Sequence, residues 1–326
     1  MRIKDFEIKN LYGMYSFKSK FDEKVNIIVG NNGTFKTTLL RILKYVVFYQ
    51  STSHFFDIDT TKINFKDNLS IEYTEYMSPL SELEKANIDD KDFRKSIEQI
   101  AQQTRDVKDK SKVTVNYNVW LPCINNEEIT ETDYRKQVKL DYISTFDIKD
   151  KDINTQQTYL DKRLVQLQSD YGYYLNGLQK QFTSYLNKQG SVTKEVYDKI
   201  YTRKTLFENL VNGAFKETGK VIDNESEKLR FIIDGKTSIE ASQLSSGEKQ
   251  LLIILLTVLL EDGREYVLMM DEPEISLHIS WQYELLNWIL ELNPNVQLIL
   301  TTHSPSIFSD GWGDKAIYME DITTKK

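Results

Sequence analysis

The chain has 326 residues, of which 40% are hydrophobic and 28% are charged, and its formal net charge is -7. This composition fits one large or two modest globular units, and the acidic balance argues against a general nucleic-acid-coating protein. A single cysteine, Cys123, excludes an internal disulfide, and the start MRIKDFEIKN has no apolar signal region. The apolar run from Leu251 to Leu260 is too short to span a bilayer. We therefore expect a cytoplasmic protein that does not insert into a membrane.

In the first half of the chain, the pattern of apolar residues changes from that of a strand, a loop and a helix to that of antiparallel strands. Val25 to Val29 predicts a strand that stops at a glycine loop, and Thr37 to Tyr49 has the apolar spacing of a helix. Ile71 to Tyr73 and Val113 to Val119 alternate with period two, which predicts antiparallel strands with one buried face. The charged stretch from Leu80 to Gln103 is interpreted as helical.

Residues 155–215 predict a helical hairpin. Gly190 ends the apolar stripe of the first helix, and Lys194 to Asn212 predicts a second helix that folds back beside it. The simplest interpretation of this segment is a solvated hairpin. The stripe consists of Leu160, Leu164, Leu167, Tyr171, Tyr174, Leu178, Phe182 and Tyr185.

The last third of the chain predicts alternating helices and strands. Its expected elements are helix Glu248 to Leu260, strand Tyr266 to Met270, helix His278 to Leu292 and strand Val296 to Thr302. We therefore expect an α/β fold whose core is built from both chain ends. The expected segments are 1–150, with the antiparallel β subdomain, 151–232, a helical lid or arm, and 233–326, the rest of the core.

A glycine loop between the first predicted strand and helix has the form of a phosphate loop. Glycines let backbone N–H groups turn toward phosphate oxygens at the positive end of the following helix. Lys36 would reach the β- and γ-phosphates, and the Thr37 hydroxyl would bind Mg²⁺. A structural strand–turn–helix without a ligand is the alternative. The candidate ATP-binding residues are Gly30, Asn31, Asn32, Gly33, Thr34, Phe35, Lys36, Thr37 and Thr38.

Phe35 departs from the usual pattern, which has glycine directly before the lysine. A side chain at this position would crowd the phosphates or force a positive φ angle. A non-glycine residue at such an angle costs about 1–3 kcal/mol. We therefore expect weaker ATP binding or slower turnover.

Two acids end the buried strand that begins at Tyr266. Carboxylates end an apolar strand at a free-energy cost unless a positive group meets them. Asp271 would hold Mg²⁺, directly or through water, and Glu272 would act as the general base toward water. The alternative is that the Asp-Glu pair caps the next helix.

Ser245, Ser246, Gly247 and Glu248 come directly before the predicted buried helix. A serine and a glycine at a helix N-terminus form an anion site, and a serine there can also be the N-cap. These residues resemble the LSGGQ signature of ABC-type ATPases, in the form common among SMC- and RecF-like members. The resemblance implies an ABC-ATPase, or P-loop NTPase, core in which two copies close on ATP, so that each signature faces the γ-phosphate held by the other subunit.

Other positions extend the resemblance over residues 1–50 and 235–320. His303 resembles the switch histidine that contacts the γ-phosphate, and Glu274 to His278 matches the place of the D-loop. The DEPE form followed by Leu277-His278 resembles RecF and OLD-family ATPases rather than transporter subunits. For the glutamine loop, Gln137 and the segment Tyr142 to Phe146 are the candidates.

The function that follows is an ATP-driven switch with ATP and Mg²⁺ as cofactors, acting as a homodimer or higher homo-oligomer. Because only about two dozen residues follow His303, we expect a separate effector, a nuclease or a toxin. Compact ATPases of this kind resemble components of bacterial anti-phage systems of the Septu PtuA type. The alternatives are a RecF- or SMC-like DNA maintenance ATPase, for which DNA would be a partner, and a weakly hydrolysing nucleotide-bound scaffold.

Overall fold

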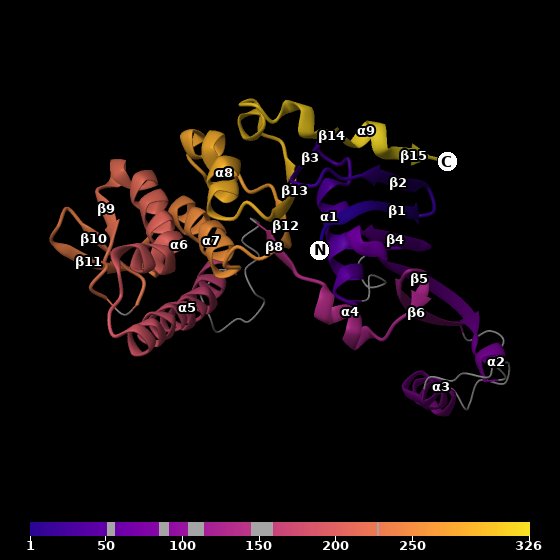
Figure 1. The fold of residues 1–326 in the computed structure, drawn as a ribbon. Helices are drawn as coiled ribbons and strands as arrows, with labels where there is room; N and C mark the ends of the chain where they lie inside the picture. Colours follow the sequence, from indigo (N-terminus) through magenta and orange to yellow (C-terminus); the bar gives the residue numbers. More distant parts are fainter. Residues whose placement is uncertain (51–55, 85–90, 104–113, 145–158, 227) are drawn as a thin grey trace. The chain divides into compact units, whose positions relative to one another are not determined.

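The structure is a computed structural model that describes residues 1–326 apart from 51–55, 85–90, 104–113, 145–158 and 227. The chain forms two compact units, and Figure 1 shows their elements in chain order. The first unit comprises Met1–Arg2, Phe21–Leu40 and Gln137–Asp321, so it contains the predicted helical segment as well as most of the predicted core. The second comprises Ile3–Lys20, Arg41–Lys136 and Ile322–Lys326. Helix α1 (Lys36–Val47) begins in the first unit and ends in the second.

A parallel sheet in the order β14-β3-β13-β12-β8 forms the centre of the first unit. Its strands are β3 (Val25–Val29), β8 (Leu140–Ser144), β12 (Tyr266–Asp271), β13 (Val296–Thr302) and β14 (Ala316–Tyr318). Every residue of β12 and β13 is buried, as expected for parallel strands covered on both faces. The predicted strands near Val25, Tyr266 and Val296 are confirmed. Their carboxyl ends lie at the same edge of the sheet because neighbouring strands run in the same direction.

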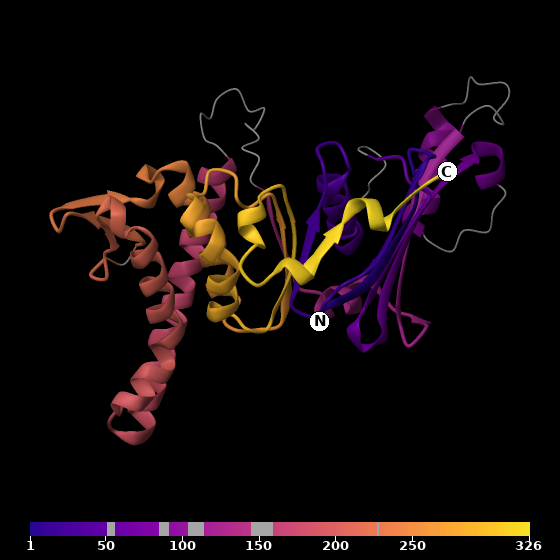
Figure 2. The same cartoon turned by 90° about the horizontal axis from the view of Figure 1, so that it is seen from above.

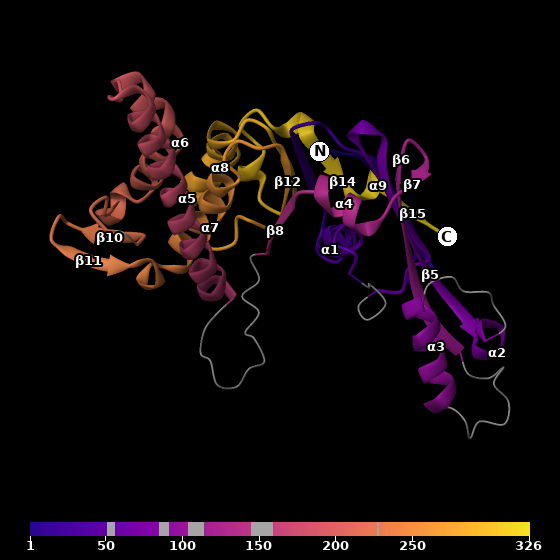
Figure 3. The ribbon, with the colours of Figure 1, turned by 60° about the horizontal axis from the view of Figure 1, so that its bottom comes forward.

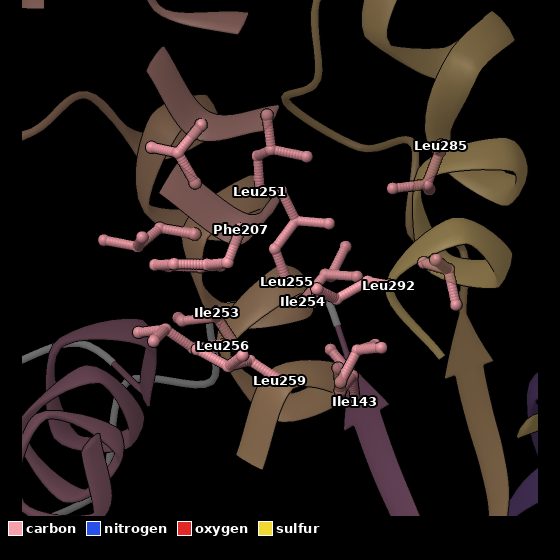
Figure 4. Packing of buried hydrophobic residues seen from close by; sticks show 14 of the residues in the cluster. Ile143, Phe207, Leu251, Ile253, Ile254, Leu255, Leu256, Leu259, Leu285 and Leu292 are labelled. Atoms are coloured by element: carbon pink, nitrogen blue, oxygen red, sulfur yellow. The ribbon is translucent and has the colours of Figure 1, made fainter. Parts of the chain in front are cut away.

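Helix α7 (Ser246–Leu260) lies at the centre of the apolar core. It is apolar nearly all round, the pattern of a helix that contacts other elements on every side. Figure 4 shows Leu251, Ile254 and Leu255 within this core, near Phe207 and Leu285. The other helices of this unit are α5 (Tyr159–Gln189), α6 (Lys194–Ala214) and α8 (Ile279–Leu292), and the short α9 (Met319–Ile322) begins in it.

The predicted hairpin is present as α5 and α6, which lie side by side in Figures 2 and 3. Helix α5 ends before Gly190, whose φ of 75° suits glycine, and Thr193 caps α6. The apolar stripe of α5 is buried from Leu160 to Tyr171 and packs with α7, so this half of the hairpin belongs to the core rather than to a solvated arm. Toward the tip, Tyr185 is exposed.

A small antiparallel sheet follows the hairpin, which the sequence analysis did not predict. Its strands are β9 (Lys220–Ile222), β10 (Arg230–Ile233) and β11 (Thr237–Glu240), in the order β11-β10-β9. Strands of three or four residues are too short for a period-two pattern to stand out. The segment 151–232, which we assigned to a helical lid or arm, therefore also contains β9 and the start of β10.

The second unit is built on an antiparallel sheet in the order β15-β2-β1-β4-β5-β6-β7. Its strands are β1 (Ile3–Leu11), β2 (Tyr15–Lys20), β4 (Thr60–Phe65), β5 (Leu69–Pro79), β6 (Thr114–Ile124), β7 (Glu127–Glu128) and β15 (Thr323–Lys325). The predicted antiparallel pair is confirmed as β5 and β6, although Val113 lies outside the described residues.

Besides the ends of α1 and α9, three α-helices are described in the second unit. They are α2 (Leu80–Leu83), α3 (Lys91–Gln103) and α4 (Glu131–Gln137), of which α4 ends at the boundary with the first unit. The stretch from Leu80 to Gln103, which we expected to be helical, is described as two helices, and residues 85–90 between them lie outside the described part. Across the described residues of both units, no helix is long and apolar enough to cross a bilayer.

Candidate nucleotide-binding site

The predicted phosphate loop lies between β3 and α1 in the first unit. Gly33 has a φ of 79°, and Phe35 has a φ of 68° directly before the helix begins. The positive φ that we expected of Phe35 is therefore present, in a region that side chains with a Cβ rarely adopt. A Cβ at Gly30 would lie 2.7 Å from the Thr34 hydroxyl, which itself donates to the carbonyl of Asn31 at 2.8 Å, so the loop closes tightly. Asn31, like Asn32 and Gly33, is exposed.

Lys36 points back across this loop. Its side-chain nitrogen donates to the carbonyls of Gly30 at 3.0 Å and Asn31 at 3.2 Å. It also lies 2.6 Å from Nε2 of His303. Burial lowers the pKa of Lys36, while the charges of Glu272 and two nearby carboxylates act in the opposite direction. The ammonium is thus held over the loop, where its charge would meet phosphate oxygens.

The two predicted magnesium ligands lie together. Asp271, at the end of β12, is fully buried, and its Oδ1 accepts hydrogen bonds from Thr37 at 2.9 Å and Thr301 at 2.6 Å. A hydroxyl and a carboxylate are the hard oxygen donors that Mg²⁺ prefers, and the donor set fits this ion. Thr301 was not among the predicted site residues. Its signal in the sequence is a threonine pair, Thr301-Thr302, at the end of an apolar strand.

Glu272 follows at the same sheet edge and, like Phe35, has a φ in the left-handed region, at 49°. Its backbone N–H donates to the Thr301 carbonyl at 3.0 Å, and its Oε1 lies 3.2 Å from Nε2 of His303. Burial raises the pKa of Glu272, since it outweighs the opposing charge of His303. An elevated pKa suits a general base. The predicted base and the predicted switch histidine therefore contact each other.

The register of the sheet explains why these groups meet. Asp271 pairs with Thr301, and Thr302 pairs with Val29, so β13 lies between the strand of the phosphate loop and the strand of the acids. Ligands of open α/β sheets bind at the carboxyl ends of the strands. Lys36, Thr37, Asp271, Glu272 and His303 all lie there.

The signature residues form a second cluster at the start of α7. Ser245 is the N-cap, and a reciprocal capping box joins it to Glu248. The serine hydroxyl lies 2.9 Å from the Glu248 carboxylate and accepts from the N–H of that residue at 3.3 Å. Ser245 thus caps the helix, as the alternative interpretation predicted, and Ser246 lies in the first turn of the helix. A Cβ at Gly247 would lie 2.3 Å from the carbonyl oxygen of Ser276, so only glycine fits this approach.

Two residues that support Glu248 were not predicted. The carboxylate is 2% exposed and accepts from Lys220 at 2.8 Å and from the Thr218 hydroxyl at 2.9 Å. Burial raises the pKa of Glu248, but the hydrogen bonds from Lys220, Ser245 and Thr218 outweigh it and hold that pKa below its usual range. No local pattern marked Lys220, since it lies 28 residues before its partner.

The glutamine-loop candidates are placed only in part. Gln137 ends α4, and Ser144 ends β8 in register with Asp271. Phe146, the last residue of the other candidate segment, lies outside the described residues. Ser144, in the middle of that segment, therefore lies beside Asp271 at the end of β12.

This chain is similar in sequence to two known proteins, among others. The Septu protein PtuA of Bacillus thuringiensis is 23% identical over 331 residues, which cover 93% of this chain and 72% of that protein. The Retron Ec83 probable ATPase of Escherichia coli is 29% identical over 154 residues, which cover 43% of this chain and 26% of that protein. The chain therefore matches about a quarter of the length of the retron protein.

Two solved structures share the fold. An Smc head bound to the C-winged helix domain of ScpA superimposes with a TM-score of 0.54 at 13% identity, covering 100% of this chain and 98% of that one. An Smc head domain with an extended coiled coil, bound to the C-terminal domain of ScpA derived from Pyrococcus furiosus, gives 0.51 at 12% identity, covering 100% and 96%. The predicted SMC-like ATPase fold is confirmed.

A family model matches residues 25–309, a range that includes the phosphate loop, the acidic strand end, the signature and His303. The chain therefore belongs to the P-loop ATPase family described as "AAA domain, putative AbiEii toxin, Type IV TA system".

Proposed function

We propose that this protein binds ATP with Mg²⁺ and hydrolyses it, and that two copies close on the nucleotide to control a separate effector. The observation that carries the proposal is the cluster at the carboxyl edge of the parallel sheet. There Thr37 contacts Asp271, and His303 lies between Lys36 and Glu272. A cation, two carboxylates, a hydroxyl and an imidazole in these positions can bind a triphosphate and activate water.

Each residue has a separate role in the proposed reaction. Lys36 and the loop N–H groups bind the phosphates, and Thr37 and Asp271 hold Mg²⁺, which when bound neutralises phosphate charge. Glu272 accepts a proton from the attacking water. His303 contacts the γ-phosphate, and its present contact with Glu272 keeps both side chains beside the loop.

The signature cluster supports action as a pair. The contacts of Ser245 and Glu248 described above run to each other, Lys220 and Thr218, and not to Lys36. A helix N-terminus with a serine and a glycine is an anion site, and in the proposed dimer it meets the γ-phosphate held by the second copy.

Steady-state hydrolysis by the purified protein tests the proposal. We expect ATP turnover that is lost in Glu272→Gln while ATP binding remains. Sedimentation of Glu272→Gln should show dimers with ATP and monomers without it. Ser245→Arg should bind ATP without dimerising or hydrolysing it, and normal turnover by this variant would refute the paired site.

Control of an effector is proposed from the similarity to the Septu protein PtuA and to the retron probable ATPase. These resemblances favour a role in anti-phage defence, with a nuclease or toxin as the effector. Affinity purification of the chain with its neighbouring genes expressed should recover a second protein in an ATP-dependent complex. Recovery of the chain alone would count against this role.

A weakly hydrolysing scaffold is the second candidate, favoured by the φ of 68° at Phe35. A side chain directly before Lys36 leaves less room for phosphates than glycine would. Single-turnover measurements distinguish the two candidates. Slow cleavage with a long-lived ATP dimer supports the scaffold, and turnover of about 1 s⁻¹ or more supports the switch.

A further inference from the structure

Glu274 lies in the turn after β12, three residues beyond Asp271, and is 8% exposed. One of its carboxylate oxygens, Oε1, accepts three hydrogen bonds from the end of β13. The donors are the Thr302 hydroxyl at 2.5 Å, the His303 backbone N–H at 2.9 Å and the Ser304 backbone N–H at 3.2 Å. A single oxygen thus binds the main chain on both sides of the His303 Cα atom.

Hydrogen bonds to an ionised acceptor are stronger than those to a neutral one. Two backbone donors from consecutive residues fix the direction in which the peptide leaves the strand. They therefore fix the starting point of the His303 side chain, whose Nε2 lies between Lys36 and Glu272. Glu274 itself does not contact those side-chain atoms.

Side chains of neighbouring residues also hold this segment. The Ser304 hydroxyl donates to the Gln282 side-chain oxygen at 2.7 Å, and the Gln282 amide donates to the Leu277 carbonyl at 3.0 Å. The turn after β12 and the residues after β13 are thus joined by side chains. The other oxygen of Glu274, Oε2, is buried and has no hydrogen-bond partner in the described structure.

A buried carboxylate costs free energy unless its charge is used. A neutral residue could cap the strand end, yet the chain places a carboxylate there. Its charge also acts on Lys36, whose pKa it raises against the effect of burial. Position and charge together connect Glu274 with the phosphate-contacting groups.

We propose that Glu274 is a positioning residue for ATP hydrolysis, which acts through the backbone of His303 and holds the imidazole against the γ-phosphate position. This inference rests on the proposed function, since it assigns a role within the same site. It predicts that a substitution of Glu274 affects turnover only as long as His303 is present.

The test is a double-mutant cycle on kcat with Glu274→Ala, His303→Ala and the double variant. Misplacement of a reacting group by about 1 Å can cost 10²-fold, so we expect Glu274→Ala to lower kcat by about 10- to 100-fold with KM changed by about 3-fold or less. The double variant should match His303→Ala within about 2-fold, because the two residues act as a unit. Glu284→Ala, at an exposed glutamate on α8, is the matched control and should match the unmodified protein.

Glu274→Gln provides a second measurement, also if the alanine variant fails to fold. Its side-chain oxygen can accept the same backbone N–H groups, so we expect more activity than in Glu274→Ala and the same dependence on His303. Losses that multiply in the double variants would overturn the positioning role, as would normal activity in Glu274→Ala or in His303→Ala. The proposed function fails separately, if Glu272→Gln hydrolyses ATP at the unmodified rate.

Discussion

Replacing Lys220 by methionine tests how the signature serine is held. The Lys220 ammonium lies 2.8 Å from the carboxylate of Glu248, which is 2% exposed. Removing one partner of a fully buried ion pair costs about 3–5 kcal/mol. Here Thr218 and the backbone and hydroxyl of Ser245 remain as donors to the carboxylate, so we expect a smaller loss of about 2 kcal/mol at pH 7.

The loss should depend on pH in a defined direction. The hydrogen bonds hold the pKa of Glu248 below its usual range. The ionised carboxylate therefore contributes stability at pH values above the usual pKa of glutamate, and this stability is lost as pH falls through the lowered pKa. Without Lys220 the largest effect that lowers the pKa of Glu248 is lost, so this carboxyl is protonated at a higher pH than in the unmodified protein. The protonated acid no longer needs a cation. The difference in unfolding free energy between Lys220→Met and the unmodified protein should therefore shrink from pH 7 to pH 4.

Urea unfolding followed by tryptophan fluorescence measures this difference, and Trp281 lies in the same core, 5.8 Å from the Phe215 ring. Lys236→Met, at an exposed lysine on the neighbouring hairpin, is the control and should change stability by less than about 0.5 kcal/mol. Adding Glu248→Gln to Lys220→Met should recover part of the loss. A Lys220→Met protein as stable as the unmodified one, or a loss that is equal at pH 7 and pH 4, would refute the reasoning.

Three further predictions concern strain and buried charge. Because Phe35 has a φ of 68°, Phe35→Gly should be more stable than Phe35→Ala by about 1 kcal/mol in thermal unfolding, and the opposite order would contradict the strain. Burial raises the pKa of Asp141 to about 6, so its ionised form costs stability above that pH. Asp141→Asn should therefore stabilise the protein by about 1–3 kcal/mol at pH 8 and by much less at pH 5, and equal gains would be inconsistent with this cause. Burial raises the pKa of Glu272, and the base must be ionised to act. As pH is lowered, kcat should therefore begin to fall at a pH above the usual pKa of glutamate. A kcat that stays constant down to that usual pKa would argue against Glu272 as the base.

The sequence by itself determined the local elements and the residues of the motifs. The strand–loop–helix around Lys36, the strands that end at Asp271 and Thr302, and the break at Gly190 each depend on a short run of neighbouring residues. Periodicity, glycine positions and strand-end acids are local signals, so a single sequence reveals them. The positive φ at Phe35 could also be anticipated, because the motif requires a turn there.

The tertiary structure alone decided which distant residues meet. It places β13 between β3 and β12, which brings His303 to both Lys36 and Glu272. The contact of Lys220 with Glu248 and the bonds from the end of β13 to Glu274 join residues about 30 positions apart. Such pairs have no periodic signature, because the sheet order and the packing of α7 create them, and neither is encoded in any short stretch of the chain.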